Sequence, residues 1–541
     1  MNPRQPRAPH MMVSGDTVVF CDDGPAPFGL DYRATGFSAR KRELSGDVEF
    51  HDLRGRTVIP GLVDAHIHIV WWAFNLKRVD LAPARSEEGA LEILKAGAKG
   101  LKPGEWLIGH GWTHNLWEKR TLPTRWSLDS LFPETPVALS SKCGHLQWVN
   151  TVAVARAGIT GSTPDPHGGE IEKVNRNGVL EPTGILKETA GELLDTVIVP
   201  PSDSTRREAV VEATAYAHSL GITGMHTPEP IEYYEDLQVL HGDGRLGLRI
   251  NFLIPVAFLD DLADLRIRHG VGDEMLRIAG VKLFSDGSLG GRTALMYDPY
   301  ENEPTNYGIC VTEAEEIAEK TLKANRLGLA MAIHAIGDKA IGNVLSAYER
   351  SALELGASGG AGTNPFVRNR IEHLQVVSPQ DWDRIRKLKP VASMQPVHLC
   401  ADMGPADSYW GARSRYAYAI KTAMDAGCPL AFGSDAPVEP VNPFYGLYAA
   451  VTRQDLERKP AQGWYPEERI SVEDALAAYT TGPALASGQP TRVGDLSAGK
   501  LADFVVLNED PLSVPPGDLK DMKPSATYLG GQMVYQDQTG E

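Results

Sequence analysis

Short runs of apolar and β-branched residues alternate with longer stretches of helical periodicity through the middle of the chain. This alternation is typical of βα units around a parallel sheet. The apolar runs predict eight strands, at residues 57–63, 222–226, 248–255, 277–284, 329–334, 370–373, 391–395 and 430–433. Because eight such units close a TIM barrel, the pattern predicts an α/β protein with a (β/α)8 barrel. Thr312 and Ser378 are the expected N-caps of helices at 313–327 and before Leu388.

Both ends of the chain show a different pattern. After an opening dozen residues, expected to be a tail, short β-type segments are broken by Gly, Pro and Asp without helical periodicity. We expect the two ends, residues 1–57 and 490–541, to pair into one composite β-sandwich beside a barrel formed by residues 58–489. The segments expected as strands are 17–21, 48–51, 504–507, 526–529 and 532–535.

A long stretch, from Asp64 to Gly221, separates the first two predicted barrel strands. A βα loop is usually far shorter than this. We therefore expect an inserted subdomain at about residues 105–200, over the catalytic face of the barrel, with strand-like segments at 106–109 and 137–141. This region is rich in tryptophan, with Trp106, Trp112, Trp117, Trp126 and Trp148.

Composition narrows the class of protein and its partners. Hydrophobic residues make up 42% of the 541 residues and charged residues 23%, which is typical of a soluble globular protein. The formal net charge of -17 disfavours nucleic acid and anionic membranes as partners, because both carry negative charge. Neither a signal peptide nor an apolar stretch of ~18 residues is found, so no membrane span is expected. The five cysteines lie far apart without a C-x-x-C pair, which favours a reducing cytoplasm.

Candidate metal ligands stand at the ends of several predicted strands. His66 and His68 form an H-x-H motif, and alternation along a strand places both imidazoles on the face that opens to a barrel's active site. Core or surface histidines would show the same motif, but His334, His373 and Asp435 end other predicted strands in the same way. Because strand ends converge in a barrel, these residues predict a metal centre. Nitrogen-rich ligation favours zinc, with iron, manganese and cobalt open.

Lys282 lies near the end of a further predicted strand, before a Gly-rich loop at residues 286–293. A lysine in such a place commonly forms a salt bridge or binds a substrate carboxylate. A lysine buried beside two cations would instead favour its neutral form, which can react with CO2 to give a bridging carbamate.

Taken together, the motifs resemble the amidohydrolase superfamily and its type 3 branch, which includes N-substituted formamide deformylases. The matching segments cover almost the whole chain: PGLVDAHIH at 60–68, KLFSDGSLGGRTA at 282–294, HAIGDKA at 334–340, IEHLQ at 371–375, QPVH at 395–398, FGSDAPVEPVNP at 432–443 and GDLSAGKLADFVVL at 494–507.

The resemblance implies a role for each candidate ligand. His66 and His68 would bind the more buried metal ion, and His334 and His373 a second one. Lys282 would carry the bridging carbamate, and Asp435 would be both ligand and proton acceptor. A version with one metal ion and an unmodified lysine stays open.

Residues 143–150 resemble a GH-x-x-W-x-N stretch of the same branch, which implies that His145 and Asn150 line the pocket. Other candidates stand near strand ends or shortly after the H-x-H motif, and for each of them a structural role is the alternative. The candidate substrate-binding residues are His145, Asn150, His226, Arg292, His398 and Trp72.

The expected activity is hydrolysis of a C-N bond in a small-molecule amide or formamide by metal-activated water, with Asp435 as the proton acceptor. A deaminase or a cyclic amidase on the same barrel is an alternative. Deaminases of this superfamily usually carry a catalytic glutamate soon after the fifth-strand histidine, and residues 334–338 have none. A metal-free scaffold is disfavoured because every ligand type is present. The exact substrate and the oligomeric state, a homo-oligomer included, stay open.

Overall fold

The computed structural model describes residues 7–22, 51–102, 104–198, 201–356 and 367–538. Most of the segment expected as a strand at 48–51 lies outside these residues, as do the first six residues of the predicted tail.

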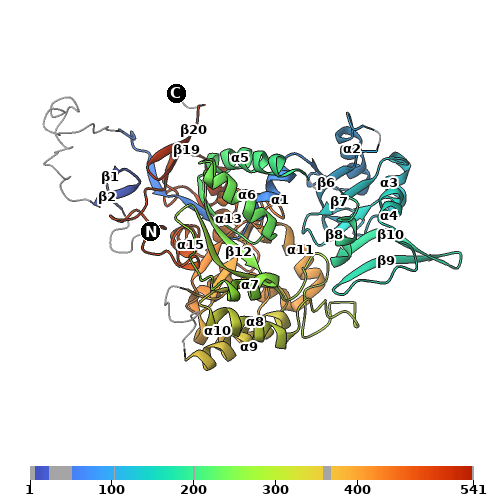
Figure 1. The fold of residues 1–541 in the computed structure, drawn as a ribbon. Coiled ribbons are helices and arrows are strands. Elements are labelled where there is room, and N and C mark those ends of the chain that lie inside the picture. The colour runs from blue at the N-terminus through green and yellow to red at the C-terminus, as the bar shows by residue number, and fades with distance from the viewer. Residues whose placement is uncertain (1–6, 23–50, 103, 199–200, 357–366, 539–541) are drawn as a thin grey trace.

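A parallel sheet of eight strands, counted over the described residues, forms the centre of the molecule (Figure 1). Its outer strands are joined by hydrogen bonds from Ala65 N–H to the Phe432 carbonyl, 2.9 Å, and from Asp435 N–H to the His66 carbonyl, 2.7 Å. The predicted (β/α)8 barrel is therefore confirmed. In the order of their pairing, the strands are β4 (Leu62–Asp64), β11 (Ile222–Thr227), β12 (Arg249–Pro255), β13 (Leu276–Phe284), β14 (Met331–Ala335), β15 (Arg370–His373), β16 (Val391–Met394) and β17 (Leu430–Phe432).

Helices cover the outside of the barrel, so strands such as β11 and β14 are buried along their whole length. The covering helices include α5 (Asp203–Ser219), α6 (Ile231–Gly242), α7 (Leu259–Asp264), α8 (Ala314–Arg326), α9 (Asp338–Leu355), α10 (Trp382–Leu388), α12 (Ile420–Asp425) and α14 (Val472–Ala478). Helix α11 (Leu399–Trp410) follows β16, and α13 (Pro443–Thr452) follows β17.

The two predicted N-caps differ from the observed helix starts. Helix α8 has Glu313 as its N-cap, and the Thr312 hydroxyl donates instead to the Phe284 carbonyl at 2.7 Å. Ser378 precedes a 3-10 turn, Pro379–Asp381, rather than α10, and makes no side-chain cap bond. Both polar side chains sit near the helix start, but tertiary contacts decide which residue begins the helix.

The segment predicted as the first barrel strand is divided between two sheets. Strand β3 (Thr57–Pro60) pairs antiparallel with β18 (Phe504–Leu507), whereas β4 pairs with β11 in the barrel. Gly61 lies at the division, where a Cβ atom would stand 2.3 Å from the Thr223 hydroxyl oxygen. The close passage therefore requires glycine and leads the chain directly into the H-x-H motif.

The two ends of the chain form one small β domain beside the barrel, where blue and red segments adjoin in Figure 1. Strands β18, β19 (Pro524–Leu529), β20 (Gln532–Gln536) and β3 form one sheet. The hairpin of β1 (His10–Ser14) and β2 (Thr17–Asp22) joins it, with Val18 packed in the same apolar cluster as Phe504 and Val506.

The stretch after β4 contains a second sheet, in the order β5 (Val79–Asp80), β6 (Leu107–Trp112), β7 (Val137–Ser141), β8 (Leu146–Val149), β10 (Val179–Glu188) and β9 (Gly169–Arg176). Helices α2 (Glu87–Gly97), α3 (Arg125–Leu131) and α4 (Thr151–Arg156) accompany it. The sheet starts at Val79, upstream of the start predicted at about residue 105. The sequence did not predict this start, because a strand of two residues leaves no readable hydrophobic pattern. Three tryptophans, Trp112, Trp117 and Trp148, pack together in its core with ring centroids 5.9 to 6.2 Å apart.

Two further findings concern the whole described chain. None of the five cysteines, all of which lie within the described residues, forms a disulfide. In the part of the chain that the structure describes, no helix is long and apolar enough to cross a membrane.

We expect Gly433→Ala to destabilise the protein, because a Cβ atom at residue 433 would stand 2.5 Å from the His66 backbone nitrogen in the barrel seam. Overpacking of this kind costs about 1–3 kcal/mol. Thermal or urea unfolding measures the loss. Gly404→Ala is the matched control, because a Cβ atom there meets nothing within 4 Å on the exposed side of α11. Equal stability of the two variants would contradict the close seam.

Candidate metal centre

Six potential ligands converge at the carboxyl-terminal ends of the barrel strands. His66 and His68 follow β4, Asp435 follows β17, and the remaining three lie at the ends of β13, β14 and β15: Lys282, His334 and His373. All are buried except His68, whose side chain is 18% exposed. The parallel strands end on one side of the barrel, and this places residues far apart in sequence in one site.

The distances within the cluster suit metal binding. The Nε2 atoms of His66 and His68 each lie 3.4 Å from Asp435 Oδ1, and the three ligand atoms lie within 4.8 Å of one another. The ring centroid of His373 is 5.1 Å from that of His66 and 4.6 Å from that of His334. The four imidazoles therefore form one continuous group around the aspartate.

Protonation also favours metal binding. Burial is the largest influence that lowers the pKa of His66, and it holds the pKa of His334 and His373 well below the usual value. These imidazoles are thus neutral, which is the form that binds a metal ion. Burial alone would raise the pKa of Asp435, but His66, His68 and His373 outweigh it and hold that pKa well below its usual range. The aspartate is therefore an anion at neutral pH.

Lys282 lacks the partner that a buried lysine needs. Its Nζ makes no hydrogen bond and no ion pair within the described residues, and lies 4.5 Å from the centroid of the Phe284 ring. Burial lowers the pKa of this amine to about 8. A buried polar group without a partner is costly. The orphaned Nζ, beside neutral imidazoles and a carboxylate, fits a site that a metal ion and a group on the lysine would complete.

A second layer of side chains orients the imidazoles. His66 Nδ1 contacts the buried carboxylate of Glu372, which accepts two hydrogen bonds from Arg370, at 2.5 and 3.0 Å. His373 Nδ1 donates to Gln395 Oε1 at 2.8 Å. These bonds engage one nitrogen of each ring and leave Nε2 for a metal ion, as is usual for metal-ligating histidines.

His334 is held differently: its Nε2 donates to the Gly287 carbonyl at 3.0 Å, so Nδ1 is the nitrogen left for a metal. The loop that follows is fixed by Asp286, whose carboxylate accepts the N–H groups of Ile336 and Gly337 at 3.1 and 2.8 Å. Burial raises the pKa of Asp286 to about 7.

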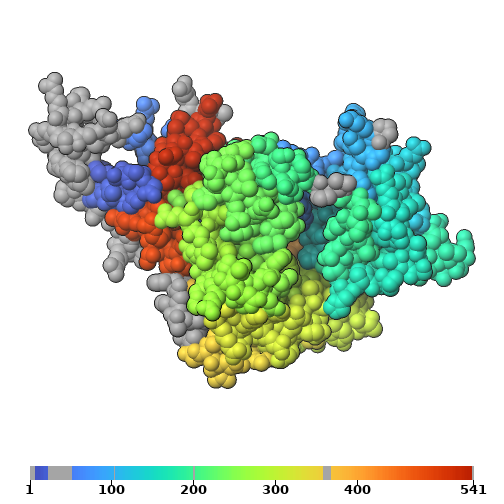
Figure 2. Space-filling view, in the orientation of Figure 1, coloured from blue at the N-terminus to red at the C-terminus, as the bar shows by residue number. Residues whose placement is uncertain are grey.

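A cavity of about 410 Å³ opens beside the cluster, lined by residues of both the barrel and the inserted sheet. Figure 2 shows the surface hollowed between these two parts, the barrel in green and the insertion in cyan. His145 and His398, both predicted to bind substrate, lie in its wall. His398 Nε2 donates to the Ser434 carbonyl at 3.1 Å and stands 3.9 Å from Asp435 Oδ2.

His145 carries charge into the cavity. Its Nδ1 donates to Glu188 Oε2 at 2.6 Å, and its ring centroid lies 6.0 Å from that of His334. Burial opposes protonation, but the Glu188 carboxylate outweighs it and raises the pKa of His145 to about 9. His145 is therefore an imidazolium at neutral pH, next to the metal ligands.

Four predicted substrate-binding residues do not line this cavity: Asn150, His226, Arg292 and Trp72. Asn150 is the N-cap of α4, and its amide also bonds the Phe132 and Thr135 carbonyls. His226 Nδ1 accepts a hydrogen bond from Arg370 at 2.9 Å, beneath the metal ligands.

Arg292 and Trp72 also have their contacts outside the cavity. Arg292 forms an ion pair with Glu303. Trp72 is 5% exposed in the barrel core, with its ring 6.1 Å from that of Tyr216. Helix α1 (Ile69–Asn75) turns consecutive side chains about 100° apart, so Trp71 lines the cavity instead.

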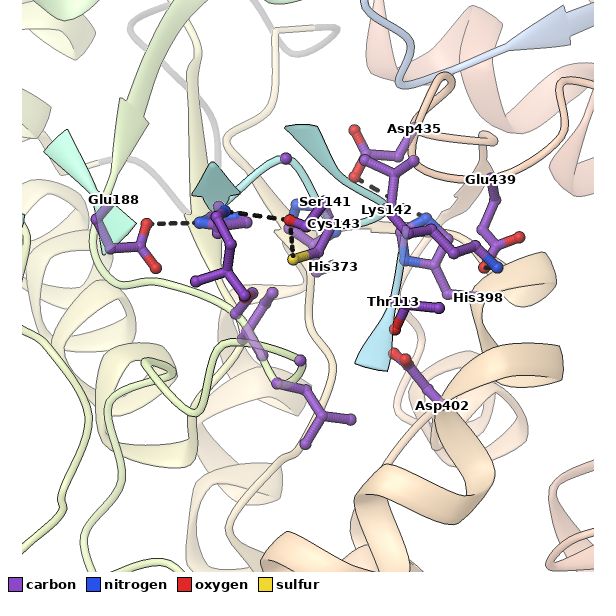
Figure 3. A pocket seen from close by; sticks show the side chains of 18 of the residues that line it. Thr113, Ser141, Lys142, Cys143, Glu188, His373, His398, Asp402, Asp435 and Glu439 are labelled. Carbon is purple, nitrogen blue, oxygen red and sulfur yellow. Dashed lines mark hydrogen bonds and ion pairs between the residues drawn. The ribbon is translucent and has the colours of Figure 1, made fainter. Parts of the chain in front are cut away.

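Several wall residues were not predicted. Figure 3 shows Lys142, Glu188, Asp402 and Glu439 around the cavity. Lys142 directly precedes the segment at 143–150, and Glu439 lies within the segment at 432–443, so the motifs contained a signal for both. Asp402 lies within a helix and outside any motif, where an acidic residue usually indicates a solvated face.

Comparison with known proteins shows the family to which the chain belongs. The model of the amidohydrolase family matches residues 49–535, so the chain belongs to that family. It is 32% identical to the putative amidohydrolase YtcJ of Bacillus subtilis, over 97% of each chain. It is 28% identical to an N-substituted formamide deformylase of Arthrobacter pascens, over 91% of this chain and 90% of that one.

Among solved structures, an uncharacterized metal-dependent hydrolase from Pyrococcus furiosus is similar, with a TM-score of 0.69 and 29% identity over 93% of this chain and 95% of that one. The fold, the ligand cluster and these relatives together make the chain a hydrolase of the amidohydrolase family and support a bound metal ion.

We expect Glu372→Gln to weaken metal binding by about 10–100-fold, because the amide replaces the carboxylate that orients His66. Titration with a competing chelator measures the affinity, and circular dichroism checks the fold. Glu349→Gln, which alters a surface pair with Arg384, is the control and should bind metal as before. Unchanged affinity in the folded Glu372→Gln protein would contradict the positioning role.

Proposed function

We propose that the protein hydrolyses the C-N bond of a small-molecule amide and that its metal ion is zinc. The observation that carries this proposal is the convergence of four histidines, Lys282 and Asp435 beside the cavity. Imidazole-rich sites with a carboxylate suit zinc, and manganese, iron or cobalt would be accepted by the same ligands. The absence of a disulfide among the five cysteines, all within the described residues, supports a reducing compartment, and we propose the cytoplasm.

The ligand set supports two adjoining metal positions. His66, His68 and Asp435 would hold one ion, and His334 and His373 the other. We place a carbamate on Lys282 between them: the amine nitrogen bonds to the carbon of CO2 and a proton leaves, so the product is an anion. The orphaned Nζ supports this assignment.

The reaction follows from the residues around the cluster. A bound divalent ion supplies a water of lowered pKa and polarises the amide carbonyl. Asp435, an anion 3.4 Å from both histidines of the H-x-H motif, accepts the water proton and returns it to the leaving nitrogen. The imidazolium of His145 donates a hydrogen bond toward the carbonyl oxygen as negative charge develops there. The products are a carboxylic acid and an amine.

Two features favour amide hydrolysis over the alternatives. The relative named N-substituted formamide deformylase supports formamides as one substrate group. The loop after His334 is held by backbone bonds to Asp286 and carries no glutamate for deamination. A scaffold function would leave the orphaned Lys282 Nζ without explanation.

We expect metal removal to abolish hydrolysis of a panel of formamides and N-acyl amines, and zinc to restore it. Asp435→Asn should lower kcat by about 1,000-fold, within the range of a lost proton-transfer group. Lys282→Ala should also lower kcat, because the carbamate can no longer form. The exposed ion pair of Asp425 and Lys421 provides matched controls, Asp425→Asn and Lys421→Ala, which should keep full activity. An active Asp435→Asn enzyme, or a protein that zinc does not activate on any amide, would refute the proposal.

We expect kcat/KM to fall above pH about 9, because His145 then loses the proton that it donates to the substrate. The sign follows from the raised pKa: the charged form is present below pH 9 and is lost above it. His145→Gln should lower kcat/KM by about 100-fold and remove this alkaline limb. The same alkaline limb in His145→Gln would assign it to another group.

A further inference from the structure

Asp402 presents an unused carboxylate oxygen to the cavity. It lies on α11, and its Oδ2 accepts hydrogen bonds from Gln375 Nε2 at 3.0 Å and from the Tyr418 hydroxyl at 2.5 Å. No hydrogen bond to Oδ1 is found among the described residues. In Figure 3 this carboxylate points toward Thr113. Two rigid donors thus hold the aspartate in place while one oxygen stays available to a ligand.

Two other carboxylates of the wall are paired with cationic neighbours. Glu188 pairs with His145 at 2.6 Å, and Glu439 pairs with Lys142 at 2.6 Å. By contrast, both donors to Asp402 are neutral groups, so its negative charge is not compensated.

Among the described lining residues, no unpaired lysine or arginine offers a matching cation. Lys142, already paired with Glu439, is the one lysine among the described lining residues, and no arginine lines the cavity there. Exposed Glu192 adds a further carboxylate to the lining. At Asp402 itself, a ligand carboxylate would meet repulsion, whereas a ligand ammonium group would find a partner.

We propose that the substrates are amides with a positively charged amino group remote from the bond that is cleaved, and that Asp402 binds this group. This inference rests on the proposed amide hydrolysis and names its substrate class. A charge placed where the cavity wall partly excludes water discriminates more strongly than the same charge on the open surface. Asp402 is thus the specificity-determining residue of the site.

Three formamides with chains of similar length test the inference on the zinc-loaded wild-type enzyme. They are the monoformyl derivative of 1,4-diaminobutane, which is a cation, N-pentylformamide, which is neutral, and 4-formamidobutanoate, which is an anion. We expect kcat/KM to be at least about tenfold higher for the cation than for the neutral compound, and lowest for the anion. The advantage of the cation should shrink as salt is added. An equal or reversed order would overturn the inference.

Two variants of α11 test whether Asp402 causes the preference for the cationic substrate. Asp402→Asn keeps the shape of the side chain and should bring the ratio of cation to neutral kcat/KM close to one. Asp407→Asn removes the same charge from the same helix at a carboxylate that bonds Ser414 and Trp464 outside the cavity, and should keep the wild-type ratio. A preference for the cation that survives in the folded Asp402→Asn enzyme would assign it elsewhere and overturn the role of Asp402.

Binding separates this inference from the proposed function. Calorimetric titration of zinc-loaded Asp435→Asn protein with the same three compounds measures recognition without turnover. Tighter binding of the cation supports the inference even if none of the three is cleaved, whereas equal binding overturns it. Hydrolysis of N-pentylformamide at the rate of the cation would overturn the inference alone and leave amide hydrolysis intact.

Discussion

The hydrogen bonds that close the barrel between β4 and β17 are the constraint on which the site depends. Within this seam, the Asp64 carboxylate accepts the N–H of His66 at 3.1 Å and both the N–H and the hydroxyl of Ser434, at 3.0 and 2.5 Å. Asp435 N–H donates in turn to the His66 carbonyl. His66 and Asp435, the first and the last candidate ligands along the chain, are therefore both neighbours of the buried Asp64 carboxylate. The barrel cannot close without bringing His66 and Asp435 together.

Beneath the ligands, the barrel interior contains a polar layer that Arg370 holds together. Arg370 is fully buried and donates to Glu372, to His226 Nδ1, to the Ala65 carbonyl and to the Ser393 hydroxyl. A buried ion pair of this kind gains little stability over apolar packing, but loss of one partner is costly. The layer around Arg370 is therefore best explained by the side chains that it positions, such as Glu372 and, through it, His66. Above this layer, the unpaired Nζ of Lys282 marks the point where the chain alone does not complete the site.

The sequence predicted the barrel and the convergence of six ligands because both follow from local patterns: short apolar runs form strands, and parallel strands end on one side. It did not predict which way single side chains point. Trp71 and Trp72 are adjacent and chemically alike, yet only Trp71 lines the cavity, because helix packing decides between them. The break at Gly61 depends on contact with Thr223, 162 positions along the chain. The negative charge of Asp402 is uncompensated because its hydrogen-bond donors, Gln375 and Tyr418, are neutral. Both donors are distant in sequence, so no motif could indicate this.

The candidate metal ligands and the other wall residues of the cavity come from different parts of the chain. The candidate metal ligands lie at the ends of barrel strands, where the seam and the Arg370 layer fix them. Lys142, His145 and Glu188 come from the inserted sheet, and Asp402 comes from a helix after β16. The insertion has its own core of tryptophans, separate from the apolar core of the barrel. Substrate choice can therefore vary in this family while the chemistry at the strand ends stays the same, which is the general advantage of placing an active site at the mouth of a barrel.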